Sequence, residues 1–170
     1  MVGSLSRSRK FIPPAAILYL YKSQIRPKME YCSLIWAGSS NQALAGLDRI
    51  QNRLQGLVSE ELFSTLPPLS HRRNVATLAL FYRYFHGKCS DELHSLVPLE
   101  RNFRVRTRFA MTSKSHPHFL TVPRTRCNFH ADSFIPRVCK LWNELPRESF
   151  PAEYDLQTFK SRVNKHLSTK

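Results

Sequence analysis

A stretch of interleaved basic and aromatic residues is the part of this sequence best suited by residue type and spacing to bind a ligand. From residue 101 to residue 126 it reads RNFRVRTRFAMTSKSHPHFLTVPRTR, with no helical period in its apolar positions. Guanidinium groups pair bidentately with phosphate oxygens, and aromatic faces stack on nucleobases. We therefore expect an extended segment that contacts nucleic acid. The candidate contacts in and after it are Arg101, Arg104, Arg106, Arg108, Lys114, Arg124, Arg126 and Arg137.

Other interpretations of this stretch stay open. One is a solvated run of charge, and another is that the arginines pair with acidic residues elsewhere in the fold. The aromatic residues Phe103, Phe109 and Phe119 fit a role as core plugs better than a role as stacking platforms.

The net charge supports a polyanionic partner. The 170 residues carry 26 Lys and Arg against 12 Asp and Glu, a formal charge of +14. The excess lies in two places, because residues 1–30 hold six basic and one acidic side chain and residues 101–140 hold nine and one. Residues 31–100 hold six of each. Such concentration is expected of a surface that binds RNA or DNA.

Catalytic groups are missing from the sequence. It contains no P-loop, no G-x-S-x-G motif and no Asp-Asp pair, and the adjacent Glu60 and Glu61 would point apart on a helix. Phosphoryl transfer by two metal ions needs converging carboxylates. We therefore predict no catalytic residue, no metal site and no cofactor in this chain.

Cysteine and histidine offer a weak alternative. Cys127, His130 and Cys139, with His116 or His118, are the best set for zinc, yet their spacing matches no strong zinc template. The simpler interpretation packs Cys139 inside a helix and leaves the histidines in solvent. A Cys-His nucleophile has equally little support.

Apolar periodicity predicts a mainly α fold, with a helical hairpin followed by a small helical module and a long basic extended segment. A first helix, opened by Pro13-Pro14, follows a stripe from Ile17 to Trp36 through Cys32, and Pro27 should kink it near Lys22–Ser23. After a turn capped by Ser40 or Asn41, a second helix carries apolar residues from Leu44 to Leu57. Arg49 and Arg53 lie on another face of it. A short connection implies two antiparallel helices.

The later helices have equally clear limits. Ser70 should cap a third helix that ends at Gly87, and a helical turn is expected at 91–97. Asp132 should cap a fourth helix that runs through Trp142, and Asp155 should open the last one. Trp142 should pack at the hydrophobic centre of the C-terminal unit. The predicted segments are a basic tail at 1–10, the hairpin at 11–60, a helical continuation at 61–100, the basic segment at 101–130 and a C-terminal helical unit at 131–170.

Compartment signals are few. The apolar stretch 11–21 follows three basic residues, but prolines interrupt it and no small-x-small cleavage site follows. No apolar run approaches the ~20 residues of a membrane helix. With four scattered cysteines, we expect a nuclear or cytoplasmic protein with no membrane partner.

Several segments together resemble one family. In order, they are LYKSQIRPKMEYC at 20–32, LDRIQNR at 47–53, LPPL at 66–69 with Arg72-Arg73, RTR at 106–108, PRTR at 123–126, FIPRV at 134–138, LWNELP at 141–146 and Phe159-Lys160. This series, from about residue 11 to 167, resembles the thumb and post-thumb part of the reverse transcriptase of non-LTR (LINE-type, jockey/CR1-like) retrotransposons.

The resemblance implies a role in RNA-directed DNA synthesis without its chemistry. Residues 11–60 would be thumb helices that hold the RNA–DNA template–primer through Arg26, Lys28, Arg49 and Arg53, and the later module would bind element RNA. The palm, with its aromatic-Ala-Asp-Asp motif and Mg²⁺, is absent, so we expect a truncated, inactive piece whose partners are RNA, RNA–DNA hybrid and a palm and fingers part. The alternative is a small basic helical protein that binds a protein partner or has no retained function, as the product of a decayed mobile element.

Overall fold

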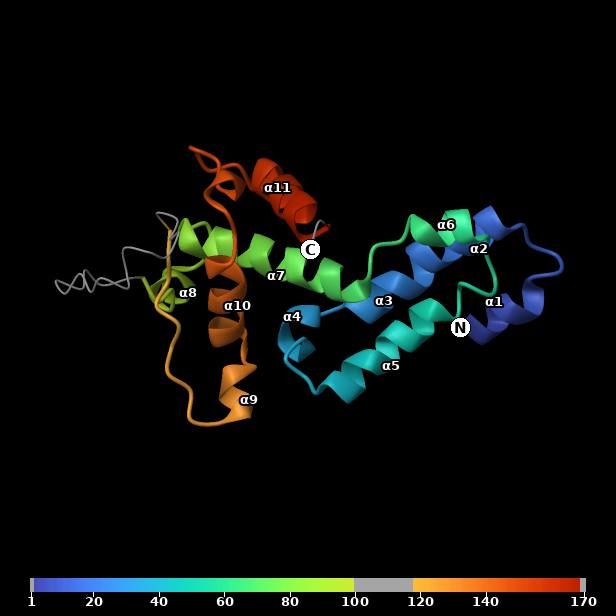
Figure 1. Cartoon of the computed structure of the whole chain (residues 1–170), viewed down its shortest axis with the longest axis horizontal. Coiled ribbons are helices and arrows are strands. Elements are labelled where there is room, and N and C mark those ends of the chain that lie inside the picture. The colour runs from blue at the N-terminus through green and yellow to red at the C-terminus, as the bar shows by residue number, and fades with distance from the viewer. Residues whose placement is uncertain (1, 100–117, 169–170) are drawn as a thin grey trace. The chain divides into compact units, whose positions relative to one another are not determined.

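The computed structural model describes residues 2–99 and 118–168, and these are mainly α-helical, as predicted (Figure 1). The chain divides into an N-terminal unit, Met1–Arg73, and a C-terminal unit, Asn74–Lys170. Between described residues, β pairing is confined to one isolated bridge that joins Leu99 and Leu120. Across residues 2–99 and 118–168, the helices lack the length and apolar character needed to cross a membrane.

The N-terminal unit begins with a short helix and an irregular rod. Helix α1 covers Val2–Ser8 inside the predicted basic tail, and Val2 is buried. Helix α2, Pro14–Leu20, starts with a proline in its first turn, where the missing N–H costs nothing. A π-helical turn η1, Tyr21–Ile25, then leads into α3, Arg26–Glu30.

A π-turn occupies the place near Lys22–Ser23 where a kink was predicted. Pro27 has no N–H to bond the carbonyl of Ser23 four residues earlier, so the regular helical ladder fails there. The N–H of Arg26 instead reaches the carbonyl of Tyr21, five residues back. One extra residue in the turn keeps the chain helical past the proline.

The rod stops earlier than predicted. The apolar stripe suggested one helix as far as Trp36, but α3 ends at Glu30 and Cys32 adopts a left-handed conformation with φ of 51°. Cys32 is therefore exposed, and not part of the core. A separate one-turn helix α4, Ser33–Trp36, follows. The Tyr31 carbonyl, released from the helical ladder, accepts a hydrogen bond from the indole N–H of Trp36 at 2.8 Å.

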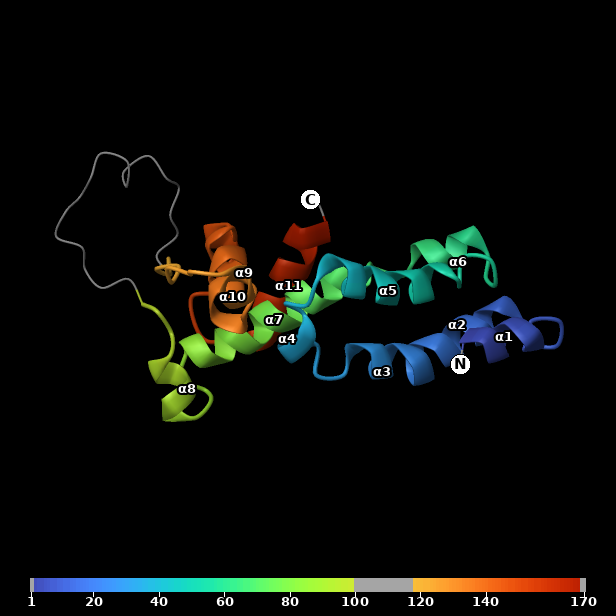
Figure 2. The ribbon, with the colours of Figure 1, turned by 90° about the horizontal axis from the view of Figure 1, so that it is seen from below.

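Helix α5, Asn41–Asn52, returns alongside α2 and α3 in the opposite direction (Figures 1 and 2). Ser40, one of the two predicted candidates, caps it, because its hydroxyl accepts the N–H of Ala43 at 3.4 Å. The helix is shorter than its apolar pattern, since Leu54 is fully buried but lies in the turns after it. Helix α6, Glu60–Ser64, completes the unit. Its core gathers Ile17, Leu18, Tyr21, Ile25, Leu54, Val58 and Leu66.

Helix α7, Leu69–Phe85, starts within the N-terminal unit, and its residues from Asn74 onward belong to the C-terminal unit. Ser70 was predicted to cap this helix but is its second residue. Gly87, with φ of 61°, ends the helix as predicted. The N–H of Lys88 bonds the Arg83 carbonyl at 2.8 Å and that of Gly87 bonds the Tyr84 carbonyl at 3.1 Å. These two bonds form a Schellman motif, which requires a left-handed residue at Gly87.

Three of the remaining helices were predicted, namely α8 Asp91–Ser95, α10 Phe134–Asn143 and α11 Leu156–Ser168. Helix α9, Asn128–Ala131, which begins in the segment predicted to be extended, and the 3₁₀ turn η3, Arg147–Ser149, were not predicted. Asp132 does not cap α10, because the separate α9 ends beside it and Ser133 takes the N-cap position. Asp155 caps α11 as predicted, accepting the N–H groups of Gln157 and Thr158 at 2.9 and 3.1 Å.

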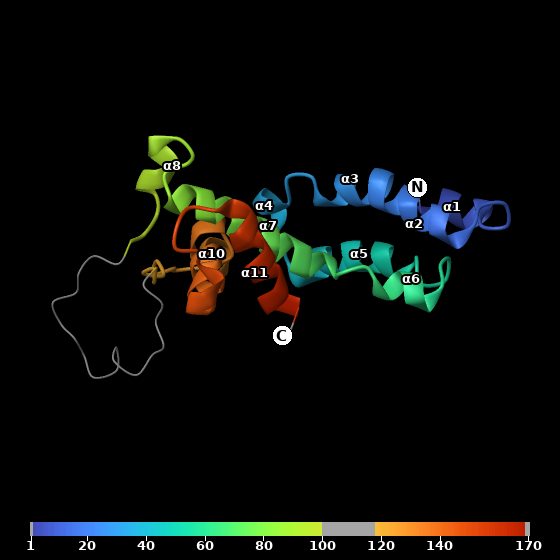
Figure 3. The same cartoon turned by 90° about the horizontal axis from the view of Figure 1, so that it is seen from above.

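Trp142 lies at the centre of the C-terminal unit, as predicted. Its ring meets Phe81 edge-on, with centroids 5.1 Å apart, and its indole N–H bonds the His118 carbonyl at 2.7 Å. Helices α10 and α11 pack against α7 around it (Figures 1 and 3). Each unit therefore has an apolar core of its own.

Candidate nucleic-acid interface

Arg49 lies on the exposed side of α5, and Arg53, four residues later, is the residue that follows the last residue of this helix. Both side chains are exposed, while Gln51 and Leu54 turn toward the core of the N-terminal unit. The Nε of Arg49 donates to the Ala45 carbonyl at 3.4 Å, which aligns its guanidinium along the helix. Two guanidinium groups at this spacing can bind successive phosphates of one strand.

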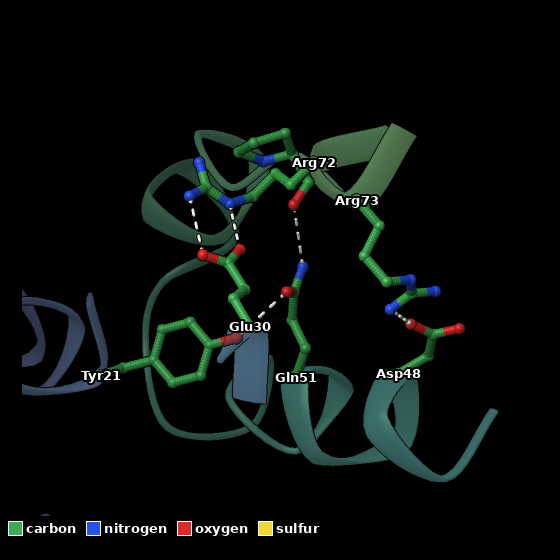
Figure 4. Close-up of polar contacts among 7 residues, drawn as sticks. Tyr21, Glu30, Asp48, Gln51, Arg72 and Arg73 are labelled. Atoms are coloured by element: carbon green, nitrogen blue, oxygen red, sulfur yellow. Dashed lines mark hydrogen bonds and ion pairs between the residues drawn. The ribbon is translucent and has the colours of Figure 1, made fainter. Parts of the chain in front are cut away.

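A buried polar chain holds the helix that carries these arginines (Figure 4). The Tyr21 hydroxyl donates to Oε1 of Gln51 at 3.1 Å, and Nε2 of Gln51 donates to the Pro67 carbonyl at 3.2 Å. Burial raises the pKa of the Tyr21 phenol to about 12, so it stays protonated and can donate. These hydrogen bonds join the π-turn, α5 and the loop before α7.

Two ion pairs engage acidic residues of the same unit (Figure 4). The Arg72 guanidinium pairs with both carboxylate oxygens of Glu30, with Nη2 at 2.9 Å from Oε2, and this bonding raises the pKa of Arg72. Arg73, which is nearly buried, has Nη1 4.0 Å from Oδ1 of Asp48.

These two ion pairs determine which basic side chains of the N-terminal unit are neutralised by a nearby carboxylate. The N-terminal unit holds ten Lys and Arg but four Asp and Glu. Glu30 and Asp48 are two of those four, and both contact Arg72 or Arg73. Within the described residues, Arg49 and Arg53 form no ion pair with an acidic side chain. The exposed side of α5 is therefore positively charged.

The two predicted contacts on α3, Arg26 and Lys28, differ in their exposure to solvent. Arg26 is half-buried, and its charge lies close enough to Tyr21 to oppose the rise in the phenol pKa. Lys28 is exposed and lines a hollow of about 350 Å³ together with residues of α4 and α5. Lys28 is therefore the better placed of the two to meet a ligand.

The predicted contacts of the C-terminal unit are only partly described. Arg124 and Arg126 are exposed in the segment before α9, and Arg137 is half-buried on α10. The structure therefore divides the described candidates between the two units. The other candidates, Arg101, Arg104, Arg106, Arg108 and Lys114, lie outside the described residues.

A second basic hollow was not anticipated from the sequence. It measures about 640 Å³ and is lined by Pro146, Glu148, Ser149, Arg162, Lys165 and His166. Nη1 of Arg162 donates to the carbonyls of Glu148 and Phe150 at 3.0 and 3.3 Å, which fixes the guanidinium at its edge. The signal in the sequence was the spacing of three basic residues over one helical turn of the last helix.

The thiols and imidazoles that were considered for zinc are not brought together in the described part of the chain. Cys127 is exposed, whereas Cys139 is buried in α10, and burial raises the pKa of its thiol to about 11. A buried, protonated thiol is a poor nucleophile and a poor ligand. Across residues 2–99 and 118–168, no three His, Cys, Asp or Glu side chains converge.

Arg72, Arg73 and Trp36 were missed as residues that organise the interface. Arg72 and Arg73 were singled out only for their place in the family resemblance, and Trp36 only as the end of the apolar stripe of the first helix. Their partners lie 42, 25 and 37 residues away along the chain, so no local spacing could reveal them.

Searches against protein-family models, curated proteins and solved structures find no match to this chain.

Proposed function

We propose that this chain binds RNA or an RNA–DNA template–primer through its basic surfaces, as the thumb and post-thumb piece of a non-LTR retrotransposon reverse transcriptase. The observation that carries the proposal is the exposed Arg49–Arg53 pair on α5, in a unit where Glu30 and Asp48 are already engaged by other arginines. Uncompensated guanidinium groups on a rigid helix suit phosphate binding.

The expected binding mode is independent of base sequence. Contacts from Arg and Lys to phosphates set the position of a duplex but carry no sequence information. Double-stranded RNA and RNA-containing hybrids are recognised largely by shape and backbone. A thumb that must follow any template would use this mode.

The acidic residues support binding over catalysis. Glu30 and Asp48 contact arginines, and the adjacent Glu60 and Glu61 are exposed on α6. Chemistry at a primer end would need a palm, with its own carboxylates and Mg²⁺. We expect no primer extension by the isolated chain with Mg²⁺ and nucleotides, and robust extension would contradict the proposal.

The decisive experiment measures binding of a labelled RNA–DNA hybrid by fluorescence anisotropy as salt is raised from about 50 to 200 mM. We expect a steep loss of affinity, because each phosphate contact releases condensed counterions. The double variant R49A/R53A should bind more weakly and lower the magnitude of the log–log salt slope by up to about two contacts.

A matched control removes the same charge elsewhere. The double variant R83A/K160A takes two exposed cations from α7 and α11 that belong to no predicted contact. This control variant should keep most of the log–log dependence of affinity on salt concentration. No binding at low salt, or binding that does not change with salt, would favour the alternative of a basic helical protein with a protein partner or no function.

A further inference from the structure

We propose that the hollow beside Trp36 holds one unstacked base of a single-stranded RNA or DNA segment. This inference rests on the proposed function, but adds a second kind of contact to it. Arg49 and Arg53 would hold the backbone of a duplex, whereas this hollow would bind a base where the strand is unpaired.

Trp36 is fixed in position as an aromatic platform. Its indole N–H donates to the Tyr31 carbonyl at 2.8 Å, which uses the one polar group of the side chain. The Arg73 guanidinium lies 5.8 Å from the ring centroid, and Arg73 is itself held beside Asp48. A ring held from two sides loses little freedom when a ligand stacks on it.

The hollow has the size and lining of a small-ligand site. Its volume of about 350 Å³ falls at the lower end of the ~300–1,000 Å³ typical of such sites. The lining residues are Lys28, Met29, Trp36, Ser39, Ala43, Leu44 and Leu47. Apolar side chains from α3 and α5 can cover a base, while the Ser39 hydroxyl can meet its polar edge.

Charge favours a nucleotide over an apolar peptide side chain. Lys28 is exposed at the hollow, and the N-terminal unit has ten basic and four acidic residues. A nucleotide carries a phosphate for Lys28 and an aromatic face for Trp36, so both features are used at once. A neutral peptide would use the apolar lining alone.

The test compares a single-stranded RNA of about ten nucleotides with an abasic strand of the same length and charge. Titration should change the emission of Trp36 with the base-containing strand only. That strand should also bind about 5- to 100-fold more tightly than the abasic one, as expected for one stacked base. In the variant W36L this advantage should disappear, while the salt dependence stays.

Three controls test whether Trp36 itself gives the base-containing strand its advantage in affinity. W36F keeps an aromatic face, so the affinity advantage should remain while the emission change is lost, because the remaining Trp142 is buried. F11L removes an exposed aromatic residue of the same unit that does not line the hollow and should change nothing. Circular dichroism shows whether W36L is folded, and if it is not, the comparison of the base-containing and abasic strands on the wild-type protein decides the test.

Each other outcome has a clear meaning. Equal binding of both strands, steep in salt and without a Trp36 signal, overturns the base site but keeps the proposed function. No binding of either strand overturns both. A Trp36 signal from an acidic Leu-containing peptide, with none from RNA, overturns the base site in favour of a peptide groove.

Discussion

Tyr21 shows how one side chain can position a charged surface that it does not touch. Its ring is fully buried in the N-terminal core, and its hydroxyl bonds the Gln51 side chain, which in turn bonds the Pro67 carbonyl. Gln51 lies on α5 between Arg49 and Arg53. The buried bond therefore sets which side of α5 faces solvent, and with it the direction of both guanidinium groups.

Replacing Tyr21 by Phe should weaken the N-terminal unit by about 1–2 kcal/mol, because a buried amide oxygen loses its donor. Hydrogen exchange of backbone amides in residues 14–54 should accelerate accordingly. The matched control is Y19F, at an exposed tyrosine of the same rod, which should leave exchange unchanged. Equal protection in Y21F and the wild type would mean that the bond does not hold the helices together.

The helices themselves are defined by their ends and by one internal irregularity. Pro27 accompanies a π-turn at Tyr21–Ile25, Cys32 is left-handed at the start of α4, and Gly87 is left-handed at the end of α7. The π-turn follows from a missing donor, and the stop at Gly87 from the freedom of glycine to adopt a positive φ. The element limits thus depend on single residues, while the packing of apolar faces holds the helices together.

The two glycines Gly87 and Gly46 should respond to alanine in opposite ways. At Gly87, φ of 61° disfavours a β-carbon, so G87A should lower the free energy of unfolding by about 1 kcal/mol. Gly46 lies inside α5 with no heavy atom within 4 Å of an added β-carbon, so G46A should raise it by about 0.5–1 kcal/mol. Urea unfolding followed by circular dichroism measures both, and shifts of the same sign would contradict this account.

The molecule consists of two units, each with its own core and its own basic residues. Stability can therefore respond to conditions in one unit alone. The C-terminal core contains two histidines, His86 and His118, packed among aromatic rings. Burial lowers the pKa of both, and for His86 the charges of His118 and Lys88 lower it further.

Acid should therefore destabilise the C-terminal unit. In the folded protein both pKa values lie below the ordinary 6.5. The unfolded chain therefore binds more protons than the folded chain when the pH falls through 6.5 toward those lower pKa values. Stability is full above pH 6.5 and declines across that window. In a W36F background, the urea midpoint reported by Trp142 should be lower at about pH 5.5 than at about pH 7.5.

Histidine variants distinguish the source of this effect. H86F removes one of the two groups and should reduce the difference between the two midpoints. H130Q changes an exposed histidine whose side chain lies outside the aromatic core and should leave the difference as it is. A midpoint that is constant or higher in acid would show that the two imidazoles are not titrating in the folded core.

Much of the fold could be predicted because the sequence signals that start and end helices are local. The mainly α class, the Ser40 and Asp155 caps, the Gly87 stop and the irregularity before Pro27 each depend on residues within a few positions of one another. Trp142 was placed in a core because an apolar stripe at helical spacing surrounds it. The errors at Cys32, Ser70 and Asp132 came from an apolar period that continued past the end of a helix, or from a capping residue that lies beside the actual helix start and not at it.

The charge excess, its two locations and the missing carboxylate pair were evident from the sequence alone, because composition and spacing do not depend on folding. Which cations keep an unbalanced charge was decided only by the tertiary structure. Glu30 meets Arg72 and Asp48 meets Arg73 through contacts between segments distant in the chain, and these pairs leave Arg49 and Arg53 exposed on α5. The hollow at Trp36 likewise exists because α3, α4 and α5 pack around it, and packing between distant segments has no local signature.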